Sequence, residues 1–373
     1  MSNSILTIDM ITRKALEILE NNLVITRNVN RQYDDSFAVQ GAKIGTTLRI
    51  RLPDRALVTD GAALQVQDDH EQYTTLTVSS QKHIGVNFTS AELTMQLDDF
   101  AERVLKPRVS QLASSVDADV ASIAYKGLFA SVGTPGTVPS TSLVLLQGQQ
   151  KLNEYAAPMS PRYATVNPAA NAGLVEGMKG LFNPTSTISR QFKNGMMGEG
   201  VLGYDEINMS QSIVNHTCGS RDASASTTVK TTVSAQGASS IVLTQGSVTT
   251  TIKAGDVFTI ANVYAVNPQT RQPTGSLQQF VATADATAVG GDWTVSVSPS
   301  IYTASQALAT VDSFPQASAA VTFLGTASTS YPQNLIYHKD AIAFATADLI
   351  MPQNVDMSSR QVHNGISLRI VRQ

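Results

Sequence analysis

Residues 93–127, LTMQLDDFAERVLKPRVSQLASSVDADVASIAYKG, predict one long amphipathic helix with a proline inside it. Thr89 and Glu92 form a Thr-x-x-Glu capping box before it, a pattern typical of a helix start. The apolar stripe changes face at Val104 and Leu105, and Pro107 follows within one turn. Proline removes a helix hydrogen bond and clashes with the preceding turn. We therefore predict a helix kink at Pro107, where the helix changes packing partner; an ordinary core helix with an incidental kink is the alternative.

Before this helix, the sequence predicts a helical arm and an extended two-stranded loop. Ile11, Ala15 and Leu19 have helical spacing. Apolar and polar residues alternate in TLRIRL (47–52), in TLTVSS (75–80) and in HIGVNFT (83–89), which is the pattern of half-solvated strands. Because an isolated hairpin is marginally stable in water, we expect this loop to lie on another surface.

The segment RIRLPDRA (49–56) places four charged residues on this loop: Arg49, Arg51, Asp54 and Arg55. Nucleic-acid binding is one interpretation, but no aromatic residues are interleaved and the chain is acidic overall. Salt bridges to neighbouring subunits suit a loop without its own core better. We therefore predict that these four residues form an intersubunit interface.

After the helix, the pattern is mixed α+β. SLVLLQGQQKLNEY (142–155) and PAANAGLVEGMKGLF (168–182) predict helices, and RYATVNP (162–168) predicts a buried strand. The return segment NLIYHKDAIAFATADLIMP (334–352) has the same mixed α+β pattern, and GISLRIVRQ (365–373) predicts a terminal strand.

The composition changes sharply between Cys218 and Gly325. This region has nine charged residues and no Glu, out of 55 charged residues in the chain. Short alternating runs separated by turn signals predict an all-β unit, a small barrel or a sandwich, inserted into the α+β host. Within it, AVNPQTRQPTGSLQQF (265–280) is expected to be a long loop.

The usual signatures of catalysis are missing from the sequence. No phosphate loop, Gly-x-Ser-x-Gly elbow or His-Glu-x-x-His zinc helix occurs. The single cysteine, Cys218, allows no intrachain disulfide, and we expect no Cys-based tetrahedral zinc site. His216 lies two residues away, but a lone cysteine without a third partner is usually inert. We assign no catalytic, cofactor-binding or metal-ligating residue, and we expect neither a cofactor nor enzyme activity.

The bulk composition limits the possible partners. The formal net charge is −3, which argues against binding nucleic acid mainly through its phosphates. Charged residues are only 15% of the chain, so much of the surface is either uncharged and polar or covered by other chains. Neither a secretory signal nor an apolar run of membrane-spanning length occurs, so no membrane partner is expected.

The order of these parts resembles that of a tailed-bacteriophage major capsid protein with the HK97 fold, in the branch of the phage P22 coat protein. DDFAERVLKPRVSQLASSVDADVA (98–121), HKDAIAFATADL (338–349) and KAGDVFTIANVYAVNPQTRQPTG (253–275) carry this resemblance. It implies an α+β fold with an N-terminal arm, an extended β loop (E-loop), a long spine helix, an axial domain and an inserted β domain. The implied division is 1–35 arm, 36–82 extended loop, 83–130 spine helix and peripheral domain, 131–217 first axial part, 218–325 inserted β domain, and 326–373 return to the axial and peripheral domains.

The resemblance also implies a function. Copies would assemble through pentamers and hexamers into an icosahedral shell around double-stranded DNA, without sequence-specific binding. A portal is an expected partner, and so is a separate scaffolding protein, because no long acidic or coiled scaffolding segment precedes the arm. The expected location is the virion, assembled in the host cytoplasm.

Two alternatives stay open on the sequence. The chain could be an encapsulin-like compartment shell of the same fold, although the β insertion disfavours it. It could instead be a module whose β domain binds carbohydrate at a surface, although the lone Trp293 and sparse aromatics of that domain argue against this.

Overall fold

The computed structural model describes residues 8–32, 47–59, 61–62, 66, 72–85, 101–178, 198–222, 224–246, 249–347, 351–363 and 366–372. The chain forms two compact units. The first comprises Met1–Pro53, Glu71–Val120 and Lys339–Gln373, and the second comprises Asp54–His70 and Ala121–His338. None of the helices in these described ranges has the length and apolar content needed to cross a lipid bilayer.

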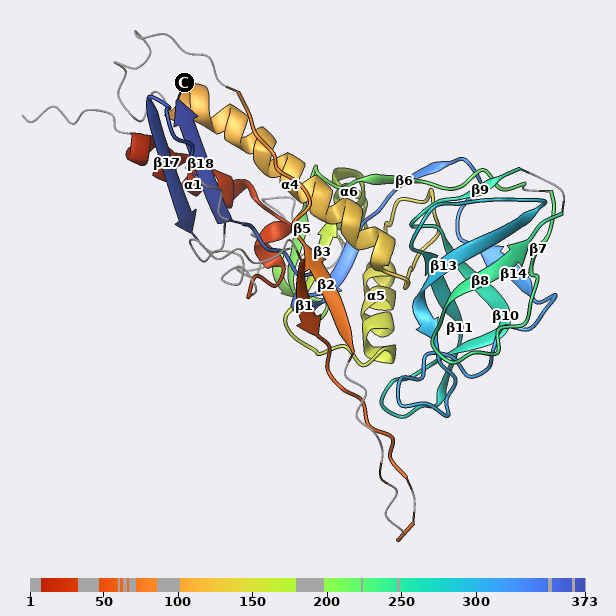
Figure 1. The fold of residues 1–373 in the computed structure, drawn as a ribbon. Coiled ribbons are helices and arrows are strands. Elements are labelled where there is room, and N and C mark those ends of the chain that lie inside the picture. The colour runs from red at the N-terminus through yellow and green to blue at the C-terminus, as the bar shows by residue number, and fades with distance from the viewer. Residues whose placement is uncertain are drawn as a thin grey trace, which may run out of the picture. The chain divides into compact units, whose positions relative to one another are not determined.

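The first unit is built on helix packing against a β hairpin (Figure 1). Helix α1 (Ile8–Asn22) packs on the hairpin of β17 (Met357–His363) and β18 (Ile366–Arg372). The helical spacing predicted for the arm and the alternation predicted for the terminal strand are both confirmed. The buried apolar residues of this unit are Ile11, Ala15, Leu16, Leu19, Leu23, Leu105, Val109, Ala113 and Ile366.

The long helix is described from Ala101 onward. Residues Ala101–Leu105 form a π-helical segment (η3), and the α-helix α4 follows directly as Lys106–Gly127. Pro107 is therefore the second residue of α4. The predicted capping box at Thr89 and Glu92 lies outside the described residues. Ile123, an apolar residue of α4, is 72% exposed, whereas Ala113 and Val120 of the same helix are buried.

A second hairpin in the first unit matches the predicted two-stranded loop. Strand β1 (Thr47–Arg51) pairs antiparallel with β2 (Tyr73–Thr77), and Arg49 lies opposite Thr75. The predicted strand at 83–89 is not found in its described part, residues 83–85, which are exposed. Just before them, the Lys82 ammonium binds the Asp119 carboxylate and the Ser115 carbonyl of α4. This segment is therefore attached to α4 by a side chain and not by the backbone hydrogen bonds of a strand pair. The short helical turns η1 (Thr26–Asn28) and η5 (Lys339–Ala341) complete the unit.

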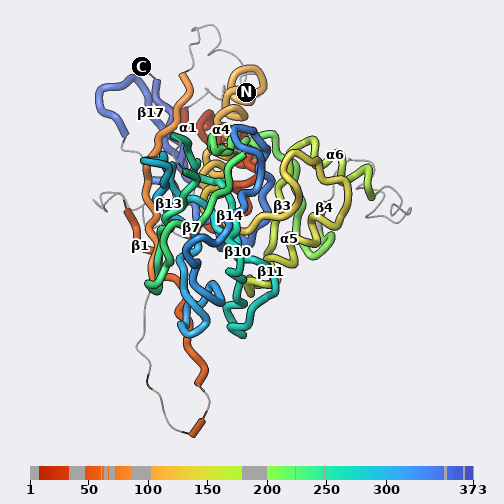
Figure 2. The backbone as a smooth tube through the Cα atoms, turned by 90° about the vertical axis from the view of Figure 1, so that its right-hand side faces the viewer, coloured from red at the N-terminus to blue at the C-terminus, as the bar shows by residue number. Residues whose placement is uncertain are grey.

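The second unit contains a mixed sheet with two helices (Figure 2). The sheet order is β16-β3-β5-β4, with β3 parallel to β5 and the outer strands antiparallel to their neighbours. Helix α5 packs on it closely, because a side chain at Gly148 would collide with Ile336. The predicted helix at 142–155 and the buried strand at 162–168 are confirmed, and the helix predicted at 168–182 is confirmed for 168–177, while 179–182 lie outside the described residues. The bounds are α5 Ser142–Glu154, β3 Arg162–Val166, α6 Pro168–Gly177, β4 Gly198–Val201, β5 Tyr204–Met209 and β16 Leu335–His338.

A closed β barrel lies between β5 and β16 in the sequence, which decides between the predicted barrel and sandwich in favour of a barrel. Its strand order is β10-β11-β13-β8-β7-β14. The core is filled by Trp293, Phe258 and Phe280, all 0% exposed. The bounds are β7 Thr227–Val229, β8 Ala238–Thr244, β10 Val257–Val266, β11 Pro273–Ala282, β13 Asp292–Ile301 and β14 Ala320–Phe323, with a small pair of β9 Thr251–Ile252 and β12 Ala286–Thr287 beside it.

The prediction of a long loop at 265–280 is wrong. β10 extends to Val266 and β11 starts at Pro273, so only a six-residue turn, 267–272, joins them. Proline is tolerated there because it is the first residue of its strand. The Asn267 side chain organises the turn by accepting hydrogen bonds from the backbone amides of Gln269 and Thr270. A sequence rich in Pro, Gly and Gln therefore formed two paired strands.

Candidate functional site

The four residues predicted to form an intersubunit interface are all exposed in the structure. Arg49 and Arg51 lie on β1 in the first unit, and the Arg49 guanidinium stacks over the Tyr73 ring at 4.7 Å. Asp54 and Arg55 belong to the second unit. Since no partner chain is present, their role in an interface stays a prediction, as does the kink at Pro107.

The connections into and out of the barrel run as a two-stranded stem. Strand β6 (Asn215–Thr217) pairs antiparallel with β15 (Ser330–Pro332), so His216 lies opposite Tyr331. The pairing continues toward the barrel, where the Cys218 amide donates to the Thr329 carbonyl at 3.0 Å. The stem holds His216 and Cys218 at the junction between the mixed sheet and the barrel.

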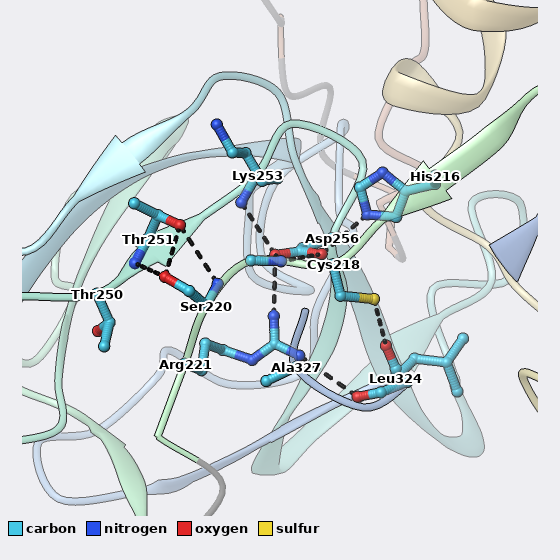
Figure 3. A network of polar contacts seen from close by, with 12 residues as sticks. His216, Cys218, Ser220, Arg221, Thr250, Thr251, Lys253, Asp256, Leu324 and Ala327 are labelled. Atoms are coloured by element: carbon cyan, nitrogen blue, oxygen red, sulfur yellow. Dashed lines mark hydrogen bonds and ion pairs between the residues drawn. The ribbon is translucent and has the colours of Figure 1, made fainter. Parts of the chain in front are cut away.

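The carboxylate of Asp256 is the centre of this junction and is only 1% exposed (Figure 3). Its Oδ2 atom accepts hydrogen bonds from Arg221 Nη1 at 2.9 Å, from the Gly219 amide at 3.0 Å and from the Lys253 amide at 2.9 Å. Its Oδ1 atom lies 2.9 Å from His216 Nε2. Arg221 also stacks on the Phe323 ring at 4.0 Å. A buried charge is tolerated here because it is fully paired and hydrogen-bonded.

The protonation of this cluster follows from its contacts. Burial opposes the charged imidazolium, but the hydrogen bond and charge of Asp256, together with Cys218, outweigh it and raise the pKa of His216 to about 9. Burial also opposes the charged form of Asp256. The hydrogen bonds from His216 and the Lys253 amide, with the charge of Arg221, nevertheless hold the pKa of Asp256 below its usual value. His216 and Asp256 are therefore an ion pair at neutral pH.

Two glycines make the junction possible. Gly255 has φ +103°, a conformation that residues with side chains rarely adopt, and a Cβ there would lie 2.4 Å from the Tyr125 ring. A Cβ at Gly219 would lie 2.1 Å from the Thr251 carbonyl oxygen. Both positions place backbone where only glycine fits, which lets the turn carrying Asp256 approach the stem.

A cavity of about 630 Å³ borders this cluster. It is lined on one side by His216, Cys218 and Asp256. Much of the remaining wall is apolar and comes from α5, from the loop before it and from the β15–β16 segment, including Val144, Leu145, Tyr331, Leu335 and Ile336. His216, Cys218 and Asp256 are thus at most 5% exposed, yet all three border this cavity.

Polar side chains also join α5 to the barrel within the second unit. Lys151 Nζ donates to Ser276 Oγ at 3.0 Å, and Asn267 Nδ2 donates to the Glu154 carbonyl at 2.9 Å. Burial raises the pKa of Tyr155, whose hydroxyl donates to Gln278 Oε1, to about 12. These contacts tie the barrel to α5 through hydrogen bonds in addition to the stem.

A second buried carboxylate organises the first unit. Asp117, on α4 and 1% exposed, accepts hydrogen bonds from the amides of Val24 at 2.7 Å and Thr26 at 3.0 Å, and from the Thr26 hydroxyl at 2.6 Å. The amide of Ile25 adds a longer contact at 3.3 Å. Asp117 therefore fixes the chain where it leaves α1.

Sequence reasoning missed both carboxylates. Asp117 is one of two Asp residues in DADVASIAYKG (117–127) that no local pattern separates, and its partners lie more than 90 residues away. Asp256 is the third partner of His216 and Cys218 and lies 40 residues from His216. The glycine before Asp256 was the available signal, because a Gly-Asp turn beside an alternating strand marks a special backbone position.

Comparison with known proteins identifies a family and a relative. The family model described as "P22 coat protein - gene protein 5" matches residues 1–373. The "Major capsid protein" of Acyrthosiphon pisum secondary endosymbiont phage 1 is 23% identical over 305 residues, covering 77% of this chain and 71% of the relative.

Similar solved structures also come from phages. The "CUS-3 coat protein I-domain" is 28% identical, covering 28% of this chain and all of that chain, with a TM-score of 0.22. A structure described as "Mycobacterium phage Che8" is 16% identical, covering 74% of this chain and 86% of that chain, with a TM-score of 0.39. With TM-scores this low, the assignment rests on the full-length family match. The chain belongs to the P22 coat protein family and is a phage major capsid protein of the P22-like branch.

Proposed function

We propose that copies of this chain assemble through pentamers and hexamers into an icosahedral shell that encloses double-stranded DNA. The observation that carries this proposal is the family match over residues 1–373. The fold expected for the chain is the HK97 fold, with α4 as part of its spine helix and the barrel as its inserted domain. The chain acts as a structural protein and not as an enzyme.

We propose that the β1–β2 hairpin makes contacts between subunits. One face of the hairpin carries Arg49, Arg51 and Tyr73, and only Ile50 is fully buried on the other. With Asp54 and Arg55, which follow it directly, it offers exposed charges for pairing with an adjacent subunit. In the proposed assembly this loop overlaps a neighbour.

The other partners follow from the same assembly. A scaffolding protein would set the shell's size, and a portal would provide the entry for DNA. The net charge of −3 suits a container that does not bind DNA strongly, so the contained DNA is held without sequence-specific contacts. Assembly would take place in the host cytoplasm and end in the virion.

The environment of Trp293 argues against a carbohydrate-binding module. This side chain is 0% exposed, and its Nε1 atom donates to the Thr250 carbonyl at 3.0 Å. A buried tryptophan cannot stack on a sugar, so the barrel lacks the aromatic platform that such a function would use at this residue.

Co-expression with the scaffolding protein of the same phage tests the proposal. We expect closed particles of uniform diameter by negative-stain electron microscopy and a single fast-sedimenting species. If only monomers or dimers form over a range of salt and scaffold concentrations, the shell proposal is wrong. Closed particles that contain enzyme cargo in infected cells, in place of DNA, would instead favour the encapsulin-like alternative.

A further inference from the structure

Three side chains with different metal-binding atoms converge at the barrel junction. One ligand atom each from His216, Cys218 and Asp256 lies within 4.8 Å of the other two. All three residues are at most 5% exposed. Imidazole nitrogen, thiolate sulfur and carboxylate oxygen are the three ligand types that zinc uses in proteins. We propose that His216, Cys218 and Asp256 bind one divalent transition-metal ion of the zinc class.

The local backbone supplies two of the ligands from one strand. His216 lies on β6, and Cys218 follows two residues later where the stem pairing continues. Side chains two residues apart on a strand point to the same face. Asp256 reaches this face from the turn before β10, at the point where Gly255 permits close approach. The three ligands are thus positioned by two elements, the stem and the turn before β10, before any metal binds.

The carboxylate of Asp256 is held in the orientation that a single-oxygen ligand needs. The Oδ2 atom is occupied by Arg221 and by the amides of Gly219 and Lys253. The Oδ1 atom is directed to His216 instead, at 2.9 Å from its Nε2 atom. Outer hydrogen bonds of this kind orient metal-binding carboxylates and affect affinity by about 10- to 100-fold.

The charges at the junction are compatible with a dication. Metal binding would displace the proton that His216 carries at neutral pH, and the Asp256 carboxylate and the Cys218 thiolate would then together neutralise a charge of +2. The positive charge of Arg221 lies on the far side of the carboxylate, where it contacts Oδ2 and stacks on the Phe323 ring. Arg221 therefore supports Asp256 from outside the ligand set.

The cavity provides the fourth position. Its volume is about 630 Å³, and all three ligands line it, so a water molecule can reach the metal through it. Zinc sites with three protein ligands complete their tetrahedral geometry with water. Because the ligands come from the stem and the barrel, the metal would link these two parts directly.

The rival interpretation is a closed ion-pair network of His216, Asp256 and Arg221 that binds no metal. Cobalt distinguishes the two, because Cys218 is the only cysteine in the chain. The full-length protein is stripped with a chelator and titrated with Co²⁺. We expect one Co²⁺ per chain, a thiolate-to-cobalt charge-transfer band, and loss of the band when Zn²⁺ is added. No such band at saturating Co²⁺ would overturn the proposal.

Two variants locate the site. Cys218→Ser should abolish the band and weaken Zn²⁺ binding by at least about tenfold. His363→Gln is the matched control, because His363 pairs with Glu20 at the surface of the first unit and should leave both measurements unchanged. Equal Zn²⁺ affinity for Cys218→Ser and the wild type would refute the assignment of the thiolate.

A measurement on the wild type covers the case in which Cys218→Ser fails to fold. Bound Zn²⁺ should slow alkylation of Cys218 by iodoacetamide by about tenfold or more, since its sulfur would be coordinated. Mg²⁺ should have no effect because it prefers oxygen ligands. Equal alkylation rates with Zn²⁺ and Mg²⁺ would show that Cys218 does not bind the metal and that the cluster is an ion-pair network.

Discussion

At the scale of single residues, Asp117 has the clearest structural role in the first unit. Four donors of the turn after α1 converge on this buried carboxylate. In Asp117→Ala these donors lose their acceptor inside the protein. We expect the free energy of unfolding to fall by about 3 kcal/mol, as for hydrogen bonds to a buried charge. Urea denaturation followed by circular dichroism measures this change.

Asp119 provides the matched control on the same helix. Its carboxylate is 46% exposed and pairs with Lys82. Exposed ion pairs contribute little, so Asp119→Ala should lower the free energy of unfolding by less than about 1 kcal/mol. Similar losses for the two variants would contradict the role assigned to Asp117.

A pH dependence is expected from His216 in chelator-treated protein. Its pKa is about 9 in the folded chain, above the usual value of 6.5. The folded state therefore binds the proton more tightly, and this stabilisation is complete below pH 6.5 and lost as the pH rises through 9. The full effect is up to about 3 kcal/mol. Urea denaturation at pH 6, 7.5 and 9 measures it.

His216→Gln isolates this contribution. The variant should be less stable at pH 6 and show a weaker change between pH 6.5 and 9, whereas His363→Gln should keep the wild-type dependence. A wild-type stability that does not change over this interval would show that His216 does not gain its proton on folding.

At the scale of elements, the segment around Pro107 combines two features that bend helices. The π-helical residues Ala101–Leu105 directly precede α4, and Pro107 lacks the amide hydrogen that a continuous α-helix uses. Pro107→Ala restores that donor, so the α-helix can extend backward. We expect folding to be retained, with a change in unfolding free energy of less than about 1 kcal/mol, because a first helical turn tolerates proline.

Assembly is where the Pro107→Ala substitution should have its effect. If the bend sets the direction of the helix in the subunit, particle diameter or yield should change, as measured by negative-stain microscopy and sedimentation. Particles with wild-type diameter and yield would show that the bend is incidental.

Elements with a strong local period could be predicted from the sequence, and contacts between distant segments could not. α1, α5 and β18 have apolar residues at the spacing that one buried face requires, and β3 is a short run that is buried on both faces. The turn at 267–272 was mistaken for a long loop because Pro and Gly suggest irregular structure, although a strand can begin at Pro273. The polar cluster at Asp256 depends on barrel closure, which no local pattern encodes.

The single cysteine illustrates the same limit. Counting cysteines led us to expect no Cys-based zinc site, since such sites usually need several. The fold places His216 and Asp256 beside Cys218, so its sulfur has two further ligand types next to it. Counting one residue type cannot detect a site of mixed composition.

At the scale of the whole molecule, the low content of charge gives each exposed charge more influence on association. Charged residues are 15% of the chain, and Arg49, Arg51 and Arg55 are three exposed positive charges within seven residues. We predict that the triple substitution of these arginines by Glu leaves the subunit folded but lowers particle yield by about tenfold or more. The reason is that like charges facing each other across an interface cost several kcal/mol.

The triple substitution of the same arginines by Lys is the matched control. Lys keeps the positive charge but not the planar, two-pronged hydrogen bonding of Arg. If charge attraction holds the hairpin to its neighbour, the Lys variant should retain most of its assembly. The difference in particle yield between the Glu and Lys variants should then decrease as the salt concentration rises. Circular dichroism and thermal unfolding establish that the Glu variant is folded. A folded Glu variant that forms particles at the wild-type yield would show that the extended loop does not make the proposed contacts. The interface would then have to lie on other exposed surfaces of the subunit.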